Sequence, residues 1–211
     1  MRRSLWLVNF VVIVIVIAIL GGGAYYYYQS STYIKTDNAH VSGNIQTISA
    51  PVSGKVASWN VNEGDTVSKN QTLGTISAGG GKSTDLTAAD NGTIIRQSVS
   101  PNQLVQAGAS VAQIVDMKKL FIVANIDEGD VKDIKEGNSV DVTVDGDPNT
   151  VIDGKVESIG NAANSLFSLM GQQNTSGNYT KTTQYIPVKI SIDNYSSKVM
   201  PGMNAEVKIK K

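Results

Sequence analysis

One unit of sequence occurs twice in this chain, and the repeat restricts its fold more than any other feature. Residues 48–76 align with residues 86–114 without a gap, at a constant offset of 38 positions. Two of the aligned pairs consist of glycine and asparagine: Gly64 with Asn102, and Asn70 with Gly108. Glycine and asparagine are the residues that best tolerate a positive φ. We therefore predict a left-handed backbone turn at the same two places in each copy.

Each copy reads as a series of short strands separated by turns. A β unit of this size does not bury its own apolar face, because an isolated small set of strands is at best marginally stable in water. We therefore expect the two copies to pack together as a pseudo-symmetric β-sandwich.

The stretch that joins the two copies, residues 77–85, contains three glycines followed by Lys82. Its Gly-Lys-Ser sequence raises the possibility of a phosphate-binding loop, which needs another glycine five residues before Gly81. Ile76 occupies that position, and a turn signal at residues 90–92 follows where the helix should run. We predict a passive, flexible glycine-rich turn instead.

The N-terminal stretch, residues 5–28, is predicted to be a membrane anchor because it carries no charge. As a helix it extends about 36 Å, enough to cross a hydrocarbon core of about 30 Å. Arg2 and Arg3 precede it and the next basic residue is Lys35, so the positive-inside rule predicts a single-pass protein with a cytoplasmic N-terminus. The alternative is a cleaved signal peptide, for which Gly22 and Ala24 fit a cleavage site. Both interpretations export everything after residue 30.

The composition excludes several classes of function. Lysine plus arginine and aspartate plus glutamate each number 18, so the chain has no basic excess for binding nucleic acid. It contains no cysteine and one histidine, His40, which excludes thiolate nucleophiles, cysteine metal sites and His-rich clusters. We expect no catalytic residues, no cofactor and no metal, and hence a protein that is not an enzyme.

The paired copies also resemble the biotinyl/lipoyl fold, in which two such halves form a flattened β-barrel. Carriers of that fold hold a modified lysine in the turn between the halves, where Lys82 lies here. Their lysine stands in Asp-Lys-Ala or Met-Lys-Met, whereas Lys82 stands in Gly-Gly-Lys-Ser. A lipoyl- or biotin-type carrier remains a minor alternative.

Several other stretches carry the patterns of one known family. The entry segment fits a Thr-Asp-x-Ala-x-Val pattern through Thr36, Asp37, Ala39 and Val41. Residues 120–146, 167–190 and 201–209 match a barrel region, an Asn-rich segment and a closing Pro-Gly-Met strand. In this order, the stretches resemble the HlyD/EmrA family of membrane fusion proteins, or efflux adaptors, in a short form.

The resemblance implies a mainly β chain with a single N-terminal transmembrane helix, a biotinyl/lipoyl-like β-sandwich and a β-barrel domain. The expected parts are a cytoplasmic tip (1–4), the anchor (5–28), a linker with the first barrel strand (29–46), the sandwich (47–116) and the barrel with a membrane-proximal domain (117–211). Within the barrel we predict strands at 120–126 and 139–144, with a short helix near 128–135 between them. Alternation predicts that Val140, Val142 and Val144 share one face of their strand.

The function implied by the resemblance is that of a non-enzymatic adaptor in the cell membrane. Its partner would be an exporter of the major facilitator class, with an ABC exporter as the alternative, and the adaptor would form a homo-oligomer. Family members of two-membrane cells carry a long helical hairpin between the sandwich halves, and residues 77–85 leave no room for one. We therefore expect no outer-membrane channel as a partner. A structural or adhesion protein of the cell surface is a further alternative.

The long segment 161–181 is the candidate contact with the partner. Predicted strands flank it at 151–159 and 183–192, and a loop of this length in a compact domain is usually functional or disordered. Its apolar cluster consists of Leu166, Phe167, Leu169 and Met170. Two interpretations stay open: the cluster docks on the exporter or the lipid interface, or it caps the open end of the barrel.

Overall fold

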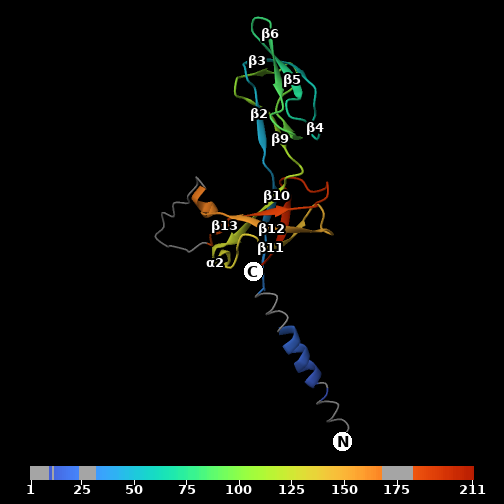
Figure 1. Cartoon of the computed structure of the whole chain (residues 1–211), viewed down its shortest axis with the longest axis vertical. Coiled ribbons are helices and arrows are strands. Elements are labelled where there is room, and N and C mark those ends of the chain that lie inside the picture. The colour runs from blue at the N-terminus through green and yellow to red at the C-terminus, as the bar shows by residue number, and fades with distance from the viewer. Residues whose placement is uncertain (1–9, 11, 24–31, 168–182) are drawn as a thin grey trace, which may run out of the picture. The chain divides into compact units, whose positions relative to one another are not determined.

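The computed structural model describes residues 10, 12–23, 32–167 and 183–211 (Figure 1). The chain divides into two compact units. The barrel unit comprises the chain up to His40 with Val123–Ser196 and Asn204–Lys211, and the sandwich unit comprises Val41–Ile122 with Ser197–Met203.

The described part of the predicted anchor is helical at Phe10 and at residues 12–23. Its large apolar side chains are 47–68% exposed, with Val16 and Leu20 at the two limits. Among the residues that the structure describes, no helix reaches both the length and the hydropathy needed to cross a membrane. Residues 5–9, 11 and 24–28 of the predicted anchor lie outside the described residues.

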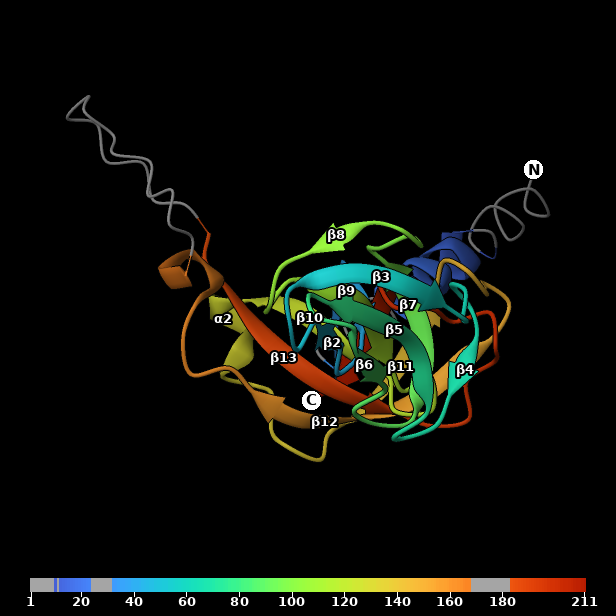
Figure 2. The ribbon, with the colours of Figure 1, turned by 90° about the horizontal axis from the view of Figure 1, so that it is seen from above.

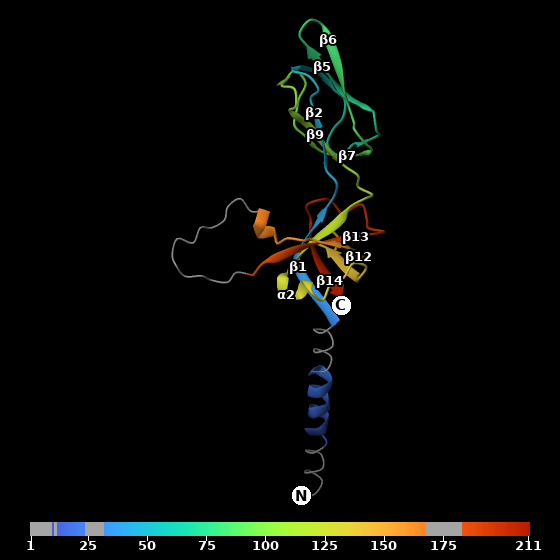
Figure 3. The ribbon, with the colours of Figure 1, turned by 60° about the vertical axis from the view of Figure 1, so that its left-hand side comes forward.

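Six strands form a closed barrel in the order β1-β10-β13-β12-β11-β14. Figure 3 labels four of them, β1, β12, β13 and β14. The six strands are β1 (Tyr33–Ser42), β10 (Phe121–Asp127), β11 (Ser139–Val144), β12 (Val151–Ile159), β13 (Tyr185–Ile192) and β14 (Asn204–Lys210). Closure leaves no free strand edge. The predicted alternation in β11 is confirmed, since Val140, Val142 and Val144 are each at most 2% exposed.

Two short helical segments complete the barrel unit. The helix α2 (Glu128–Val131) follows β10 directly, and its first turn is capped by Asp127, whose Oδ1 accepts a 2.8 Å hydrogen bond from the Gly129 amide. The 3₁₀ helix η1 (Asn164–Phe167) lies in the connection between β12 and β13. The predicted helix near residues 128–135 is thus present but confined to its first turn.

The repeated sequence forms two four-stranded sheets, β2-β9-β7-β4 and β6-β5-β3-β8. The strands are β2 (Gln46–Ser49), β3 (Gly54–Trp59), β4 (Thr66–Val67), β5 (Thr72–Ala78), β6 (Lys82–Thr87), β7 (Gly92–Gln97), β8 (Leu104–Val105) and β9 (Ser110–Val115). A shift of 38 positions relates β3 to β7, β4 to β8 and β5 to β9, and so relates one sheet to the other. Figure 2 shows β4 and β8 at separate edges of this unit. Each sheet combines strands from both copies, so the copies interlock around one apolar core.

The predicted left-handed turns are confirmed in both copies. The φ angles are 93° at Gly64, 72° at Asn102, 65° at Asn70 and 85° at Gly108. Because aligned positions adopt the same backbone region, the repeat in sequence is also a repeat in conformation.

The connection between the copies differs from the predicted flexible turn over residues 77–85. The strands β5 and β6 continue through it as a hairpin, in which Ser77 pairs with Ser83 and Ala78 pairs with Lys82. Residues 79–81 alone form the turn, where Gly80 and Gly81 have φ angles of 82° and 77°. The polar residues 82–85 read as loop in sequence but form a strand because β5 supplies a partner.

Candidate contact site on the barrel

The Thr-Asp-x-Ala-x-Val motif, residues 36–41, coincides with an irregularity in the pairing of β1. The register between β1 and β14 shifts between Thr36 and Ala39. At the shift, the Thr36 hydroxyl donates to the backbone oxygen of Asn125 at 3.2 Å and accepts from the amide of Asn38 at 3.1 Å. Ala39 and Val41 are 4% and 1% exposed. The motif therefore encodes a β-bulge that turns polar side chains outward while two small apolar ones stay in the core.

Three asparagines join this bulge to the connection between β12 and β13. The side-chain amide of Asn125 donates to the Asn38 side-chain oxygen at 2.9 Å, and Asn164 donates to the Asn125 side-chain oxygen at 2.7 Å. Asn125 thus bridges β1, β10 and η1, which are far apart in sequence. This network fixes the start of η1 against the barrel wall.

The connection between β12 and β13 is closed at its base. The hydroxyl of Ser165 donates to the side-chain oxygen of Gln184, and the backbone oxygen of Gln184 accepts from the Glu128 amide at 3.0 Å. The Gly160 amide donates to the Pro187 oxygen at 2.8 Å. The chain therefore leaves and re-enters the barrel at one place, with residues 168–182 between.

Leu166, one member of the predicted contact cluster, is 76% exposed on η1. The Phe167 side chain, Leu169 and Met170 lie outside the described residues. For Leu166, such exposure does not fit the capping interpretation, which requires a buried side chain. The docking interpretation of the whole cluster stays a prediction.

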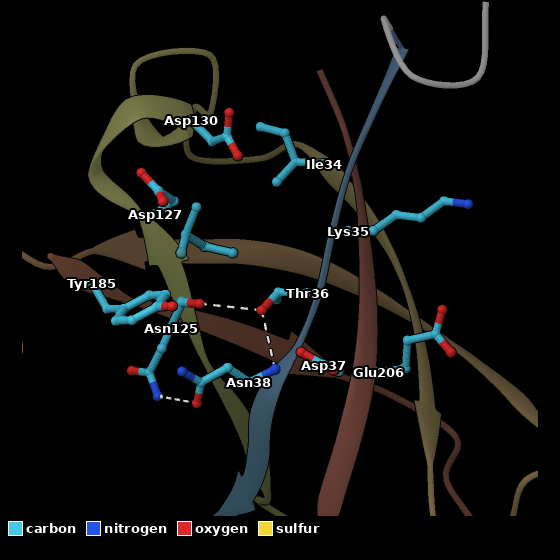
Figure 4. A pocket seen from close by; sticks show the side chains of 11 residues that line it. Ile34, Lys35, Thr36, Asp37, Asn38, Asn125, Asp127, Asp130, Tyr185 and Glu206 are labelled. Carbon is cyan, nitrogen blue, oxygen red and sulfur yellow. Dashed lines mark hydrogen bonds between the residues drawn. The ribbon is translucent and has the colours of Figure 1, made fainter. Parts of the chain in front are cut away.

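A hollow of about 580 Å³ lies beside the asparagine network, between β1 and the start of α2 (Figure 4). We call it the α2–β1 hollow, and its lining includes Ile34, Thr36, Asn125, Asp127, Asp130 and Tyr185. Figure 4 shows Asp127 and Asp130 on one wall and Lys35 extending away on the far side of β1. Sequence reasoning missed this hollow, because its walls come from four strands and a helix that no single motif contains.

Lys82 and His40, the other residues considered in the sequence analysis, do not lie in a common site. Lys82 is exposed next to the glycine turn of the β5–β6 hairpin, and His40 is exposed on β1. Within the described ranges, no group of three or more His, Cys, Asp or Glu side chains is arranged to hold a metal ion.

Electrostatics single out Asp90, which lies in the sandwich unit. The Asn91 amide donates to its Oδ1 at 3.0 Å and holds the pKa of this carboxyl below its usual value, with further lowering by the positive charge of Lys69. Both influences favour the ionised form. Asn91 separates Asp90 from Gly92, whose close approach to the Val115 backbone leaves no room for a side chain. We therefore assign the Asp90 carboxylate a structural role, which is to stabilise this turn.

Two family models match the chain. Residues 44–116 match the barrel-sandwich hybrid domain of YhbJ, and residues 120–209 match the YknX-like β-barrel domain. The putative efflux system component YhbJ of Bacillus subtilis is 53% identical over 180 residues, which cover 85% of this chain and 80% of that protein. The probable multidrug resistance protein EmrK of Escherichia coli is 33% identical over 114 residues, covering 53% of this chain and 29% of EmrK.

Solved structures with the same fold include efflux adaptors. The periplasmic adaptor protein EmrA superposes with a TM-score of 0.58 at 14% identity, covering 85% of this chain and 99% of that one. The membrane fusion protein Spr0693 of Streptococcus pneumoniae gives 0.59 at 13% identity, covering 85% and 98%. At these identities the likeness concerns the fold alone.

Proposed function

Because this chain belongs to the HlyD/EmrA family of membrane fusion proteins, we propose that it is the adaptor of a membrane exporter. The observation that carries the proposal is the 53% identity, across both units, to a protein named as an efflux system component. Members of this family are adaptors and not enzymes, so the chain would act by docking, and the energy for export would come from the partner.

The proposed partner is an exporter of the major facilitator class, with an ABC exporter as the alternative. Support comes from the likeness to EmrA and EmrK and from the segment that resembles the EmrA branch. The adaptor would act as a homo-oligomer. The two copies are joined by the short β5–β6 hairpin, with its turn at residues 79–81. Because this connection is not a long helical hairpin, we expect no contact with an outer-membrane channel.

We also propose that residues 5–28 anchor the chain, with the N-terminus in the cytoplasm and both β units outside. The exposed apolar side chains of the helix at residues 12–23 support this, since such a surface is stable in lipid and unfavourable in water. Arg2 and Arg3 before the uncharged run set the proposed orientation.

The proposed contact with the partner is the connection between β12 and β13, with Leu166, Phe167, Leu169 and Met170. The hydrogen bonds at the base of this connection and the exposure of Leu166 support a segment that is available for contact with a partner. The family arrangement would place this end of the barrel near the membrane.

The test is to isolate the intact chain in mild detergent from its own cells and to identify exporters that co-purify. A major facilitator protein is the expected partner. Co-purification of an ABC exporter would show that the partner is an ABC exporter and not a major facilitator protein. If the chain is isolated without any transporter, a structural surface protein is favoured. A chain lacking residues 5–28 behind a cleavable export signal serves as the control for anchoring.

A further inference from the structure

Lysine side chains gather where the barrel follows the proposed anchor. In the pairing of β1 with β14, Tyr33 lies opposite Lys210 and Lys35 lies opposite Lys208. Directly opposite residues of an antiparallel pair share a face, and the intervening Ile34 is only 5% exposed. These four side chains therefore point out of the barrel. We call them the lysine face: Tyr33, Lys35, Lys208 and Lys210.

Two lysines of this face carry a charge that no neighbour compensates. Lys208 Nζ forms an ion pair with Glu206 Oε1 at 3.4 Å, and Asp141 lies opposite Lys208 on β11. The exposed side chains of Lys35 and Lys210, in contrast, have no hydrogen bond or ion pair with any residue that the structure describes. Such charges attract a surface of the opposite sign.

The chain itself brings the lysine face close to the end of the proposed anchor. The Lys211 amide donates to the Thr32 oxygen at 2.9 Å, so β14 ends beside the start of β1. Thr32 follows residue 28, the end of the proposed anchor, by four positions. Four residues span at most about 14 Å. A bilayer that holds the anchor therefore lies within reach of this end of the barrel.

The sign of the charge changes along the two strands. Asp37 comes four positions after Tyr33, and Glu206 comes four positions before Lys210. Both carboxylates thus stand about 13 Å farther along the strands from the anchor. In physiological salt an electrostatic potential decays over about 8 Å. A negatively charged surface at the anchor therefore attracts the lysines more strongly than it repels these carboxylates.

The attraction is confined to one side of the barrel. Residues 127–136, which include α2, contain five carboxylates and two lysines. Figure 4 shows Asp127 and Asp130 on the side of β1 opposite to Lys35. The lysine face, and not the α2 side, is therefore suited to an anionic surface, and contact there sets the tilt of the barrel.

We propose that the lysine face binds anionic phospholipid headgroups of the bilayer that holds the anchor. Lys35 and Lys210 contact the phosphate groups, and Tyr33 lies at the headgroup boundary, where tyrosine and lysine side chains are favoured. The inference goes beyond the adaptor function but rests on the proposed anchor, because the anchor brings a bilayer within reach. The contact orients the barrel relative to the membrane before an exporter binds.

The experiment measures lysine acylation in the full chain, reconstituted in phosphatidylcholine nanodiscs with or without phosphatidylglycerol. The uncharged reagent N-hydroxysuccinimide acetate modifies accessible lysines, and mass spectrometry gives the rate at each position. At low salt, Lys35 and Lys210 should each react at least about five-fold more slowly on the anionic discs. In 1 M salt, where the screening length falls to about 3 Å, this difference should vanish.

Lys155 is the matched control, because it is exposed on β12 of the same barrel and outside the lysine face. Lys35→Gln should bring the rate at Lys210 on anionic discs close to its rate on neutral discs, whereas Lys155→Gln should leave it unchanged. Equal rates on both discs, protection of Lys155 equal to that of Lys35, or equal effects of the two substitutions would overturn the proposal. Melting curves check that each variant is folded.

Retention of the chain on the discs in high salt is measured separately and tests the anchor. A chain that stays on the discs without protection of the lysine face overturns this inference alone. A chain that leaves the discs overturns the anchor and this inference together. Neither measurement contains an exporter, so both results are distinct from a failure of the co-purification test.

Discussion

The amide of Asn102 donates a 2.8 Å hydrogen bond to the carbonyl of Val56, at the position where Gly64 donates to Ile94 in the other copy. These two bonds are related by the 38-residue offset of the repeat. Each joins a left-handed turn of one copy to a strand of the other. The turns therefore do more than reverse the chain: they fasten the two copies together.

This relationship predicts the effect of changing Asn102. Asn102→Ala should lower the free energy of unfolding by about 1 kcal/mol, because alanine tolerates the φ of 72° poorly. Asn102→Gly should stay within about 0.5 kcal/mol of the original chain. Urea unfolding of both variants measures the difference, and equal stability of the alanine and glycine variants would contradict the explanation.

A second prediction concerns Asp147, which is 8% exposed and accepts hydrogen bonds from Thr150 at 3.1 Å and Ser196 at 2.9 Å. Asp147→Ala should cost about 1–3 kcal/mol, since it removes the buried acceptor of two hydroxyl hydrogen bonds. The neighbouring Asp145 is exposed, and Asp145→Ala is the matched control with little expected effect. Thermal unfolding compares the two, and a neutral Asp147 variant would be evidence against a structural role.

A third prediction concerns Lys82. If the β5–β6 turn is passive, Lys82→Ala should leave export unchanged and stability within about 0.5 kcal/mol, because the side chain is exposed. Intact-mass measurement of protein from its own cells should show no lipoyl or biotin increment. A modified Lys82, or a ten-fold loss of export in the variant, would instead support the carrier alternative.

A fourth prediction tests topology. Protease added to intact cells, or to spheroplasts where an outer membrane is present, should remove both β units and leave residues near the N-terminus protected, because the proposed anchor places the units outside. Antibodies against a tag at each end follow the cleavage. Protection of the C-terminal tag in intact cells, with cleavage after lysis, would reverse the proposed orientation.

A fifth prediction separates docking from capping in the β12–β13 connection. Phe167→Ser with Leu169→Ser should abolish co-purification and export while changing the melting temperature little. If the cluster caps the barrel, the same change should cost about 2–4 kcal/mol through lost burial. Leu104→Ser is the control, because Leu104 is 79% exposed in the sandwich unit, similar to Leu166. Unchanged partner binding and unchanged stability would place the interface elsewhere.

Features that depend on local backbone preference were open to prediction from the sequence. The four left-handed positions at Gly64, Asn70, Asn102 and Gly108 follow from residue types that tolerate a positive φ, whatever surrounds them. The alternation of Val140, Val142 and Val144 likewise marks one strand and its buried face. The repeat itself predicted two interdependent halves, because neither is able to bury its apolar residues alone.

Tertiary pairing decided the rest. The residues 82–85 are polar and follow three glycines, and they form a strand because β5 offers its edge. The α2–β1 hollow brings Thr36, Asn125 and Tyr185 together from strands separated by up to 149 positions (185 − 36). Local patterns report φ preference and periodicity, whereas strand partners are chosen by burial and hydrogen bonding across the whole chain. The sequence by itself thus determined the turns, the strands with clear alternation and the family, and the closed barrel alone determined which side chains share the hollow.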